Sequence, residues 1–259
     1  MHQRAKVGAT ARRRALQVPW WRRGKTPLFG TVAIVALLVA LFIYMANSQA
    51  PNIGAQPAIP SVVNQVTHVS PTVISAVGTG GVTNQIKVVN GTAVLKGTDG
   101  KPEVVYIGAG YCPYCAAQRW SMIVALSRFG TFKNLQMTHS SSSDVYPDTS
   151  TFTFYGSTYT SQYIDFVPVE ETGQDQNTVI QTPTVEQQNL LDTYDSSKYV
   201  GSQAGGIPFI DYGNRLISVS SAYSPQVLAG QSWQDIASAL STSSDTTTQN
   251  IVGNANYMT

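Results

Sequence analysis

The sequence of 259 residues contains only two cysteines, Cys112 and Cys115, and three histidines. A framework of several structural disulfides is therefore excluded, and the cysteine pair is free for a chemical role. A structural zinc site needs four ligands, so it would have to recruit His68 and His139, because the third histidine lies close to the N-terminus. Attachment of a c-type haem needs a histidine directly after the second cysteine, where this chain has Ala116.

Charged residues are also scarce, at 12%, and negative charge is absent from the first part of the chain: no Asp or Glu precedes Asp99. Eight of the sixteen Lys and Arg residues lie before residue 26, so the remainder carries eight basic and fourteen acidic side chains, a formal charge of −6. An acidic body gives no support to binding of nucleic acid. The basic segment has a better explanation in the element that follows it.

The run 28–45 (LFGTVAIVALLVALFIYM) contains 18 residues and no charge. This length is near the lower limit for crossing a hydrocarbon layer of roughly 30 Å. Trp20, Trp21 and Tyr44 stand near its two ends, where interfacial aromatic residues are expected. The positive-inside rule then places residues 1–27 in the cytoplasm and the C-terminal body outside the cell membrane.

The alternative is a cleaved signal peptide, since Ala46-Asn47-Ser48 and Ser48-Gln49-Ala50 have the small residues of a cleavage site. However, 27 residues before the apolar run and 18 within it are long for such a peptide. We therefore expect an uncleaved single-pass anchor, followed by a Pro-containing linker over 46–60.

Beyond the linker, the sequence predicts a folded domain over 61–240 and a flexible Ser/Thr/Asn-rich tail over 241–259. Apolar spacing within 61–77 indicates one or two helices interrupted at Pro71. Asn90-Gly91 is typical of a hairpin turn, which would join 86–89 to 93–95.

The rest of the domain alternates strands and helices in the order of thioredoxin, an α/β fold, with a β-rich insertion at about 139–185. The first predicted elements are a strand over 104–108, a helix over 116–129 and a strand over 135–138. Two strands, over 151–155 and 159–167, are predicted around Gly156-Ser157, and a helix over 185–194 is capped by Thr184. A strand over 207–212 would pair with 216–220 across Gly213-Asn214, and a last helix begins in the capping box Ser232–Asp235.

Cys112-Pro113-Tyr114-Cys115 lies at the predicted junction of a strand and a helix, which is typical of a redox site. Unpaired N–H groups at a helix N-terminus favour an anion, so the first thiol is easier to ionise. Cys112 would attack through a mixed disulfide, and Cys115 would resolve it. Pro113 suits the first helical turn, and we expect it to contact substrate together with Tyr114 and the preceding Tyr111. The alternative is two inert buried cysteines.

The stretch GAGYCPYCAAQRW (108–120), with ALSRFG (125–130), resembles a membrane-anchored thioredoxin-like family that is found in archaea and some bacteria and is catalogued as a domain of unknown function. Three further stretches, at 144–147, 151–156 and 163–170, are similar to the same family, and the resemblance spans about 60–240. It implies a thioredoxin-like fold and redox chemistry, and it supplies no substrate.

The wider thioredoxin superfamily provides a second match, because its members place a cis-proline loop opposite the CxxC motif. Ile207-Pro208, followed by an apolar strand, resembles this loop. The resemblance implies that Pro208 is cis and that the backbone of Ile207 pairs with the substrate peptide. An ordinary proline at a strand start is the alternative, and Thr182-Pro183 is a weaker candidate for the loop.

One position departs from the superfamily, whose members often carry a buried carboxylate where this chain has Tyr106. A tyrosine, with a reference pKa of about 10, cannot act as a base near neutral pH. Either Glu103 substitutes or the proton leaves to water, which puts fast reductase turnover in doubt. Arg119 would either stabilise the thiolate or face solvent, and Trp120 is expected in the core.

The sequence therefore predicts an extracytoplasmic thiol–disulfide oxidoreductase that acts on protein disulfides, as oxidase or isomerase rather than reductase. We expect protein thiols or disulfides as substrates, a membrane redox partner, and no cofactor or bound metal. A non-catalytic binding module and a CxxC metal-binding protein are the alternatives. In the binding module, the aromatic residues of the insertion would form an exposed patch; otherwise they form the core of a small sheet.

Overall fold

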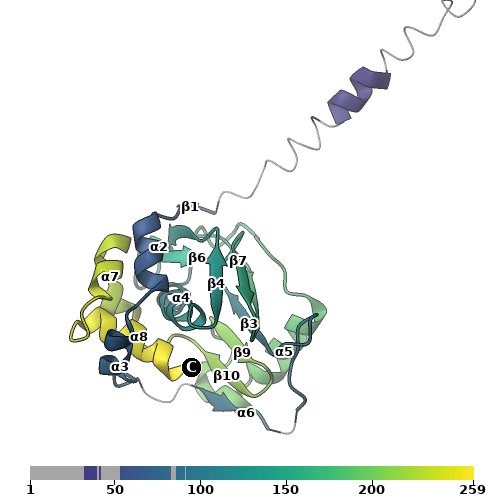
Figure 1. The fold of residues 1–259 in the computed structure, drawn as a ribbon. Coiled ribbons are helices and arrows are strands. Elements are labelled where there is room, and N and C mark those ends of the chain that lie inside the picture. Colours follow the sequence, from purple (N-terminus) through teal and green to yellow (C-terminus); the bar gives the residue numbers. More distant parts are fainter. Residues whose placement is uncertain (1–31, 40, 42–52, 83–85, 91) are drawn as a thin grey trace, which may run out of the picture. The chain divides into compact units, whose positions relative to one another are not determined.

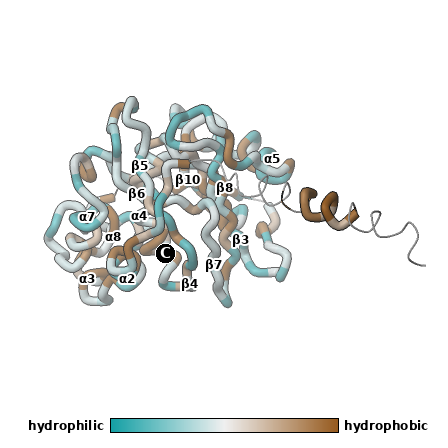
Figure 2. Tube along the Cα trace, turned by 90° about the horizontal axis from the view of Figure 1, so that it is seen from above, coloured by the Kyte–Doolittle hydropathy of each residue, from teal (hydrophilic) through white to brown (hydrophobic). Residues whose placement is uncertain are grey.

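A computed structural model describes residues 32–39, 41, 53–82, 86–90 and 92–259. The chain divides into two units, Met1–Ala50 and Pro51–Thr259. In the first unit, residues 32–39 and 41 are helical and apolar (Figure 2). Among the described residues, no helix combines the length and the apolar character needed to cross a membrane. The predicted tail 1–27 and half of the predicted span 28–45 lie outside the described residues.

A five-stranded mixed sheet forms the centre of the second unit (Figure 1). The strand β3 pairs in parallel with one neighbour, β8, and antiparallel with the other, β9, which continues antiparallel into β10. Across the sheet, the order is β2 (Lys87–Val88), β10 (Leu216–Val219), β9 (Phe209–Tyr212), β3 (Glu103–Gly108) and β8 (Asp165–Glu170).

Alternation along β3 divides the core into two parts, because successive side chains of a strand point to opposite faces. Tyr106 belongs to a large core with Trp120, whereas Val105 and Ile107 belong to a smaller core. The large core contains residues of α2 (Pro60–Thr67), α3 (Pro71–Val77), α4 (Pro113–Leu126), the 3₁₀ turn η3 (Pro225–Leu228), α7 (Trp233–Ala239) and α8 (Thr246–Tyr257). The smaller core contains residues of α5 (Val185–Tyr194) and α6 (Ser197–Val200), which is followed by η2 (Gly201–Gln203).

Two small sheets adjoin the central one. One has the order β1 (Gln56–Pro57), β5 (Gln136–His139), β6 (Ser150–Thr153), and the other pairs β4 (Gly130–Lys133) with β7 (Thr158–Ser161). The rings of Phe132, Phe154, Tyr159 and Phe166 pack against one another between these strands and β8. The aromatic residues of the insertion thus contribute mainly to a core, although Tyr163 remains 64% exposed.

Several predicted elements are confirmed. The strand before the cysteines is β3, and the helix after them is α4, which begins three residues earlier than predicted. Thr184 and Ser232 each form a capping box, at the starts of α5 and α7. The strands β9 and β10 form the predicted hairpin, with Leu216 opposite Tyr212. Pro71 begins a second helix, at a position where no backbone N–H is needed.

The strand predicted over 135–138 is confirmed as β5, which pairs with β1 and β6 in a separate sheet. The strand that lies beside β3 in parallel is β8. Pro168 in the middle of β8 argues against a central strand, but β8 lies at the edge of the sheet, where a missing N–H is tolerated. The predicted insertion at about 139–185 contains β6, β7 and β8.

The hairpin predicted around Asn90-Gly91 is wrong. Residues 86–89 and 93–95 both lie along the β9–β10 hairpin: Val89 N–H donates to Arg215 O and Leu95 N–H to Gly213 O. Gly91 itself lies outside the described residues. Strands lie on both sides of Gly156-Ser157 as predicted, but they belong to different sheets, since β6 pairs with β5 and β7 pairs with β4.

The predicted flexible tail 241–259 instead contains α8, a buried helix. Asp245 caps it by accepting from the N–H groups of Thr247 and Thr248, and Ile251 and Val252 have no exposed surface. Polar composition concealed this helix, because many of its Thr and Asn side chains are themselves buried or hydrogen-bonded. The predicted linker 46–60 is likewise too long: β1 and the start of α2 lie within its last residues, and 46–52 lie outside the described residues.

Candidate active site

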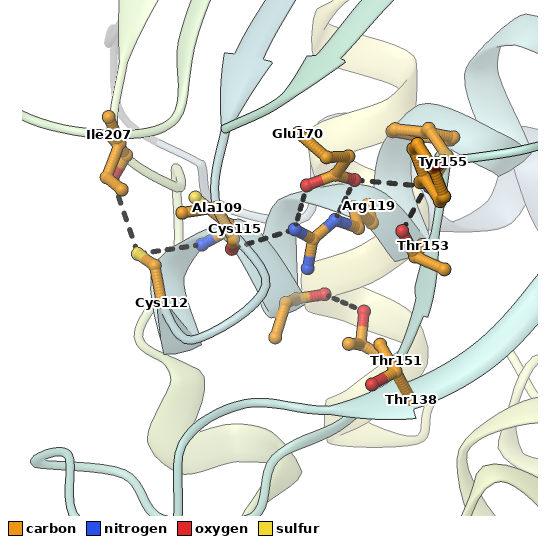
Figure 3. Close-up of polar contacts among 12 residues, drawn as sticks. Ala109, Cys112, Cys115, Arg119, Thr138, Thr151, Thr153, Tyr155, Glu170 and Ile207 are labelled. Carbon is orange, nitrogen blue, oxygen red and sulfur yellow. Dashed lines mark hydrogen bonds and ion pairs between the residues drawn. The ribbon is translucent and has the colours of Figure 1, made fainter. Parts of the chain in front are cut away.

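Cys112 is the N-cap residue of α4 (Figure 3). Its sulfur accepts a hydrogen bond from the Cys115 N–H at 3.3 Å, and its carbonyl accepts from the Ala116 N–H at 3.0 Å. Pro113 occupies the first helical turn, where no N–H is needed. A sulfur in this place receives the unpaired N–H groups and the positive end of the helix dipole, which both favour a thiolate.

The loop before β9 faces this sulfur from the other side. The Cys112 thiol lies 3.7 Å from the carbonyl oxygen of Ile207, and the Ile207–Pro208 peptide bond is cis, as predicted (Figure 3). The weaker candidate, Thr182-Pro183, lies in the segment before α5. The structure therefore brings the motif Cys112–Cys115 and the loop Ile207-Pro208 together from two separate parts of the domain.

The two thiols are free, and their surroundings shift their pKa values in opposite directions. Hydrogen bonding from the Cys115 side chain lowers the pKa of Cys112, helped by the N–H groups of Cys115 and Tyr114 and by the charge of Arg119, and opposed by burial. Complete burial raises the pKa of Cys115 well above its ordinary value. Of the two thiols, Cys112 is therefore the one that ionises more readily.

Arg119 lies one helical turn beyond Cys115 and has no exposed surface, so the predicted solvent-facing alternative is wrong. Its Nε donates to Glu170 at 2.9 Å, and its Nη2 donates to Glu170 at 2.5 Å and to Ala109 O at 2.8 Å (Figure 3). Burial alone would lower the pKa of this guanidinium, but the adjacent carboxylate of Glu170 raises it above its usual value. The positive charge of Arg119 is thereby fixed close enough to act on both thiols.

Glu170 is a site residue that the sequence did not reveal. It ends β8 and is 1% exposed, and it also accepts a hydrogen bond from the Phe154 N–H at 3.1 Å. An acidic residue at the end of a largely apolar strand was the available signal. Recognising its role required its pairing with Arg119, 51 positions earlier in the chain.

Tyr106 lies on β3, six residues before Cys112. It is fully buried, its hydroxyl makes no hydrogen bond, and burial raises its pKa well above the usual value. A Cβ at Gly108 would lie 3.0 Å from the Cys115 sulfur and would also clash with the Tyr106 hydroxyl, so a glycine is required there. Glu103, predicted as a substitute base, lies at the opposite end of β3 beside Asp165, away from the thiols.

Aromatic side chains surround the exposed side of Cys112. The Tyr111 carbonyl accepts from the Ser141 N–H at 2.8 Å, which holds the segment 140–149 beside the motif. The Tyr114 ring meets the Tyr146 ring edge-on, with centroids 6.0 Å apart. Tyr111 and Tyr114 thus flank the motif, and Tyr146 is an additional neighbour that the sequence did not assign to the site.

No group of three or more His, Cys, Asp or Glu side chains in the described part of the chain is arranged to hold a metal ion. The His139 ring packs against Trp233 at 4.3 Å, and His68 contacts Thr67 at the end of α2. The histidines that a Cys₂His₂ site would need therefore have other neighbours.

Fold and site together define a mixed α/β domain with a helix-capping dithiol. The chain belongs to a family described as a domain of unknown function (DUF929), whose match spans residues 87–259. Neither a curated protein nor a solved structure matches the chain significantly.

Proposed function

We propose that this protein is a membrane-anchored, extracytoplasmic thiol–disulfide oxidoreductase with a thioredoxin-like fold, which acts on protein disulfides. The observation that carries the proposal is the position of the Cys112 sulfur. It caps α4, lies 3.7 Å from the Ile207 carbonyl beside a cis proline, and has a lowered pKa. Nucleophilic thiols in exchange reactions have this setting.

The strand order supports the thioredoxin-like part of the proposal. The CxxC motif follows β3, a parallel strand lies on one side of β3, and an antiparallel hairpin that begins at the cis proline lies on the other. Connecting two parallel strands requires a crossover, which α4 begins and the insertion extends before β8.

The reaction conserves thiols and electrons. A substrate thiolate attacks the Cys112–Cys115 disulfide at Cys112, and Cys115 leaves as a thiol after taking up a proton. A second substrate thiolate then attacks the mixed disulfide, which releases Cys112 and leaves the substrate oxidised by two electrons. The same steps in reverse reduce a substrate disulfide.

Oxidation or isomerisation is favoured over reduction. A lowered pKa of Cys112 stabilises the reduced form of the pair, and a stabilised dithiol makes its disulfide a stronger oxidant. The uncharged run 28–45, preceded by basic residues, supports an anchor that places the domain on the outer side of the membrane. A membrane redox partner would then regenerate the disulfide.

The test uses the full-length chain and two matched variants, Cys112→Ser and Cys115→Ser. Serine is a good N-cap, so Cys112→Ser is expected to keep α4 capped. We expect Cys115→Ser to accumulate mixed disulfides with a reduced, unfolded substrate protein, and Cys112→Ser to form none. The wild-type reduction potential, measured in glutathione buffers, is expected to be more oxidising than about −230 mV.

Two results would overturn the proposal. If Cys115→Ser traps no partner and the wild type forms no internal disulfide, the domain acts as a binding module. A potential near that of thioredoxin, about −270 mV, would keep the redox chemistry and reverse its direction.

A further inference from the structure

Two segments outside the motif frame the exposed side of the dithiol. The segment 140–149 is held by the hydrogen bond from Ser141 N–H to Tyr111 O, and the turn 171–178 by one of 2.7 Å from Gly110 N–H to Thr172 O. Gln174 joins the two segments by donating from Nε2 to Ser140 O at 3.1 Å. Side chains on these segments are therefore held at the rim of the site.

Both segments carry acidic residues: Asp144 and Asp148 on the first, Glu171 and Asp175 on the second. We call Asp144, Glu171 and Asp175 the acidic rim. Asp175 lies two residues after Gly173, whose carbonyl carbon lies 3.0 Å from the position a Cβ would take on Gly110. Burial raises the pKa of Tyr111, and the charges of Asp144 and Glu171 add to this effect, which places their negative potential at the residue beside Cys112.

Several basic residues lie at the other end of the same elements. Lys101 lies just before β3, Arg128 just after α4, and Arg215 in the turn after β9. These positions are far from Cys112, because β3 and β9 approach it with their opposite ends. The acidic rim is therefore not neutralised from that side.

Nearer cations do not offset the rim either. Arg119 is buried and paired with Glu170. Lys198 lies on α6, nine residues before Ile207, and its ammonium group lies 4.8 Å from the centroid of its neighbour, Tyr199. With a formal charge of −6 beyond the basic N-terminal segment, the domain presents a negative face around its reactive sulfur.

An apolar side chain is exposed next to Asp144 of the acidic rim. Val145 is 67% exposed, and it lies between Asp144 and Tyr146, whose ring meets Tyr114. Lysine and arginine bury their hydrocarbon stems on such surface while their charged ends remain in water, and aromatic faces attract cations. The negative charge and the apolar surface therefore both favour lysine or arginine side chains.

We propose that the site selects cysteine-containing polypeptide segments in which lysine or arginine flanks the reacting cysteine. The acidic rim attracts the cationic side chains, and Tyr114, Val145 and Tyr146 receive their stems. This inference rests on the proposed function, since it assigns a substrate class to the same dithiol.

The experiment compares three short peptide disulfides that differ only in the residues beside cysteine, which are Lys, Gln or Glu. In each reaction, the reduced Cys112–Cys115 dithiol passes two electrons to the peptide disulfide, and two peptide thiols are released. Each second-order rate constant with the full-length chain is divided by that of dithiothreitol with the same peptide, which removes intrinsic differences in disulfide reactivity.

We expect the Lys peptide to react at least about tenfold faster than the Glu peptide at low ionic strength, which is the scale of electrostatic steering. The ratio should fall towards one in 1 M salt, where the Debye length is about 3 Å. The double variant Asp144→Asn/Glu171→Gln should lower the ratio at low salt. Asp99→Asn, which removes a charge near the start of β3, is the control and should leave the ratio unchanged.

The outcomes separate the two proposals. If the Gln peptide does not react with the wild type, the proposed function fails and this inference fails with it. If all three peptides react with normalised rates within about twofold, or if the ratio is insensitive to salt or to the double variant, exchange activity stands and selection by the acidic rim is refuted.

Discussion

Arg119 carries a positive charge at a position without solvent access, and Glu170 is its sole carboxylate partner among the described residues. Two ions taken out of water lose several kcal/mol of hydration each, and their mutual attraction and hydrogen bonds offset that loss only while both are present. The positive charge of Arg119 also helps to lower the pKa of Cys112. Substitutions can therefore distinguish the contribution of the pair to stability from its effect on this pKa.

Arg119→Met is expected to lower the free energy of unfolding by about 3–5 kcal/mol, because it leaves Glu170 buried without a counterion. The double variant Arg119→Met/Glu170→Met should recover most of this loss, since apolar side chains of similar volume replace both ions. Its Cys112 pKa should nevertheless be higher than that of the wild type, because the charge of Arg119 helps to lower it.

Urea unfolding measures the first effect, and the pH dependence of alkylation by iodoacetamide measures the second. A double variant with restored stability and an unchanged Cys112 pKa would show that the pair is structural only.

Asp211 is a second buried charge, on β9 and away from the thiols. Burial raises its pKa to about 6, although Asn214 N–H donates to it. The folded protein thus holds this proton more tightly than the unfolded chain, whose Asp has a pKa near 3.8. Stability should fall as the pH rises between these two values, by about 2–3 kcal/mol in all, since each pH unit of the interval contributes about 1.4 kcal/mol.

The measurement is urea unfolding at pH 3.5 and pH 7 for the wild type and for Asp211→Asn. The wild type should lose more free energy of unfolding than the variant over this interval. Equal losses in the two proteins would show that the Asp211 pKa is not raised by folding.

At the scale of elements, α8 illustrates how a polar helix can stabilise a core. Ile251, Val252 and Ala255 form its apolar stripe, and the Asn254 side chain donates to Gln118 of α4 at 2.8 Å. The Ser121 hydroxyl of α4 donates to the Ile251 carbonyl at 2.9 Å. The last helix therefore supports the helix that carries the cysteines.

Ile251→Ala is expected to lower the free energy of unfolding by about 2–5 kcal/mol, because it deletes buried apolar groups and leaves a cavity. Thr246→Ala, at an exposed position of the same helix, is the control and should change it by no more than about 0.5 kcal/mol. Equal effects of the two substitutions in thermal or urea unfolding would contradict the burial of α8.

At the scale of the whole molecule, the unit Pro51–Thr259 contains its own core. Its first described elements contribute to that core, since Val62 and Val66 of α2 have no exposed surface. The boundary of the folded domain therefore lies before α2, which makes the effect of N-terminal deletions predictable.

A chain that begins at residue 53 is expected to unfold cooperatively, with a Cys112 pKa equal to that of the full-length protein. A chain that begins at residue 69 loses Val62 and Val66, and should be less stable by at least about 3 kcal/mol, given about 1.5–3 kcal/mol for each buried side chain. Circular dichroism during urea unfolding compares the two chains. Equal stability of both would place α2 outside the cooperative unit.

The sequence by itself determined the features that depend on neighbouring residues. The strand–CxxC–helix junction, the capping boxes at Thr184 and Ser232, and the β9–β10 hairpin follow from turn chemistry, capping and short apolar periods, whose physical range is a few residues. The resemblance of Ile207-Pro208 to a cis-proline loop also predicted the cis bond.

Only the tertiary structure decided the features that depend on distant partners. Glu170 became the partner of Arg119, β8 the parallel neighbour of β3, and α8 a buried helix, because packing around α4 brought those segments together. The local sequence pattern argued against β8 and α8. Pro168 weakened the strand signal of β8, and the polar side chains of α8 indicated a flexible tail. Burial and hydrogen bonding to other elements outweighed these local preferences, since buried polar groups are stable wherever the fold supplies their partners.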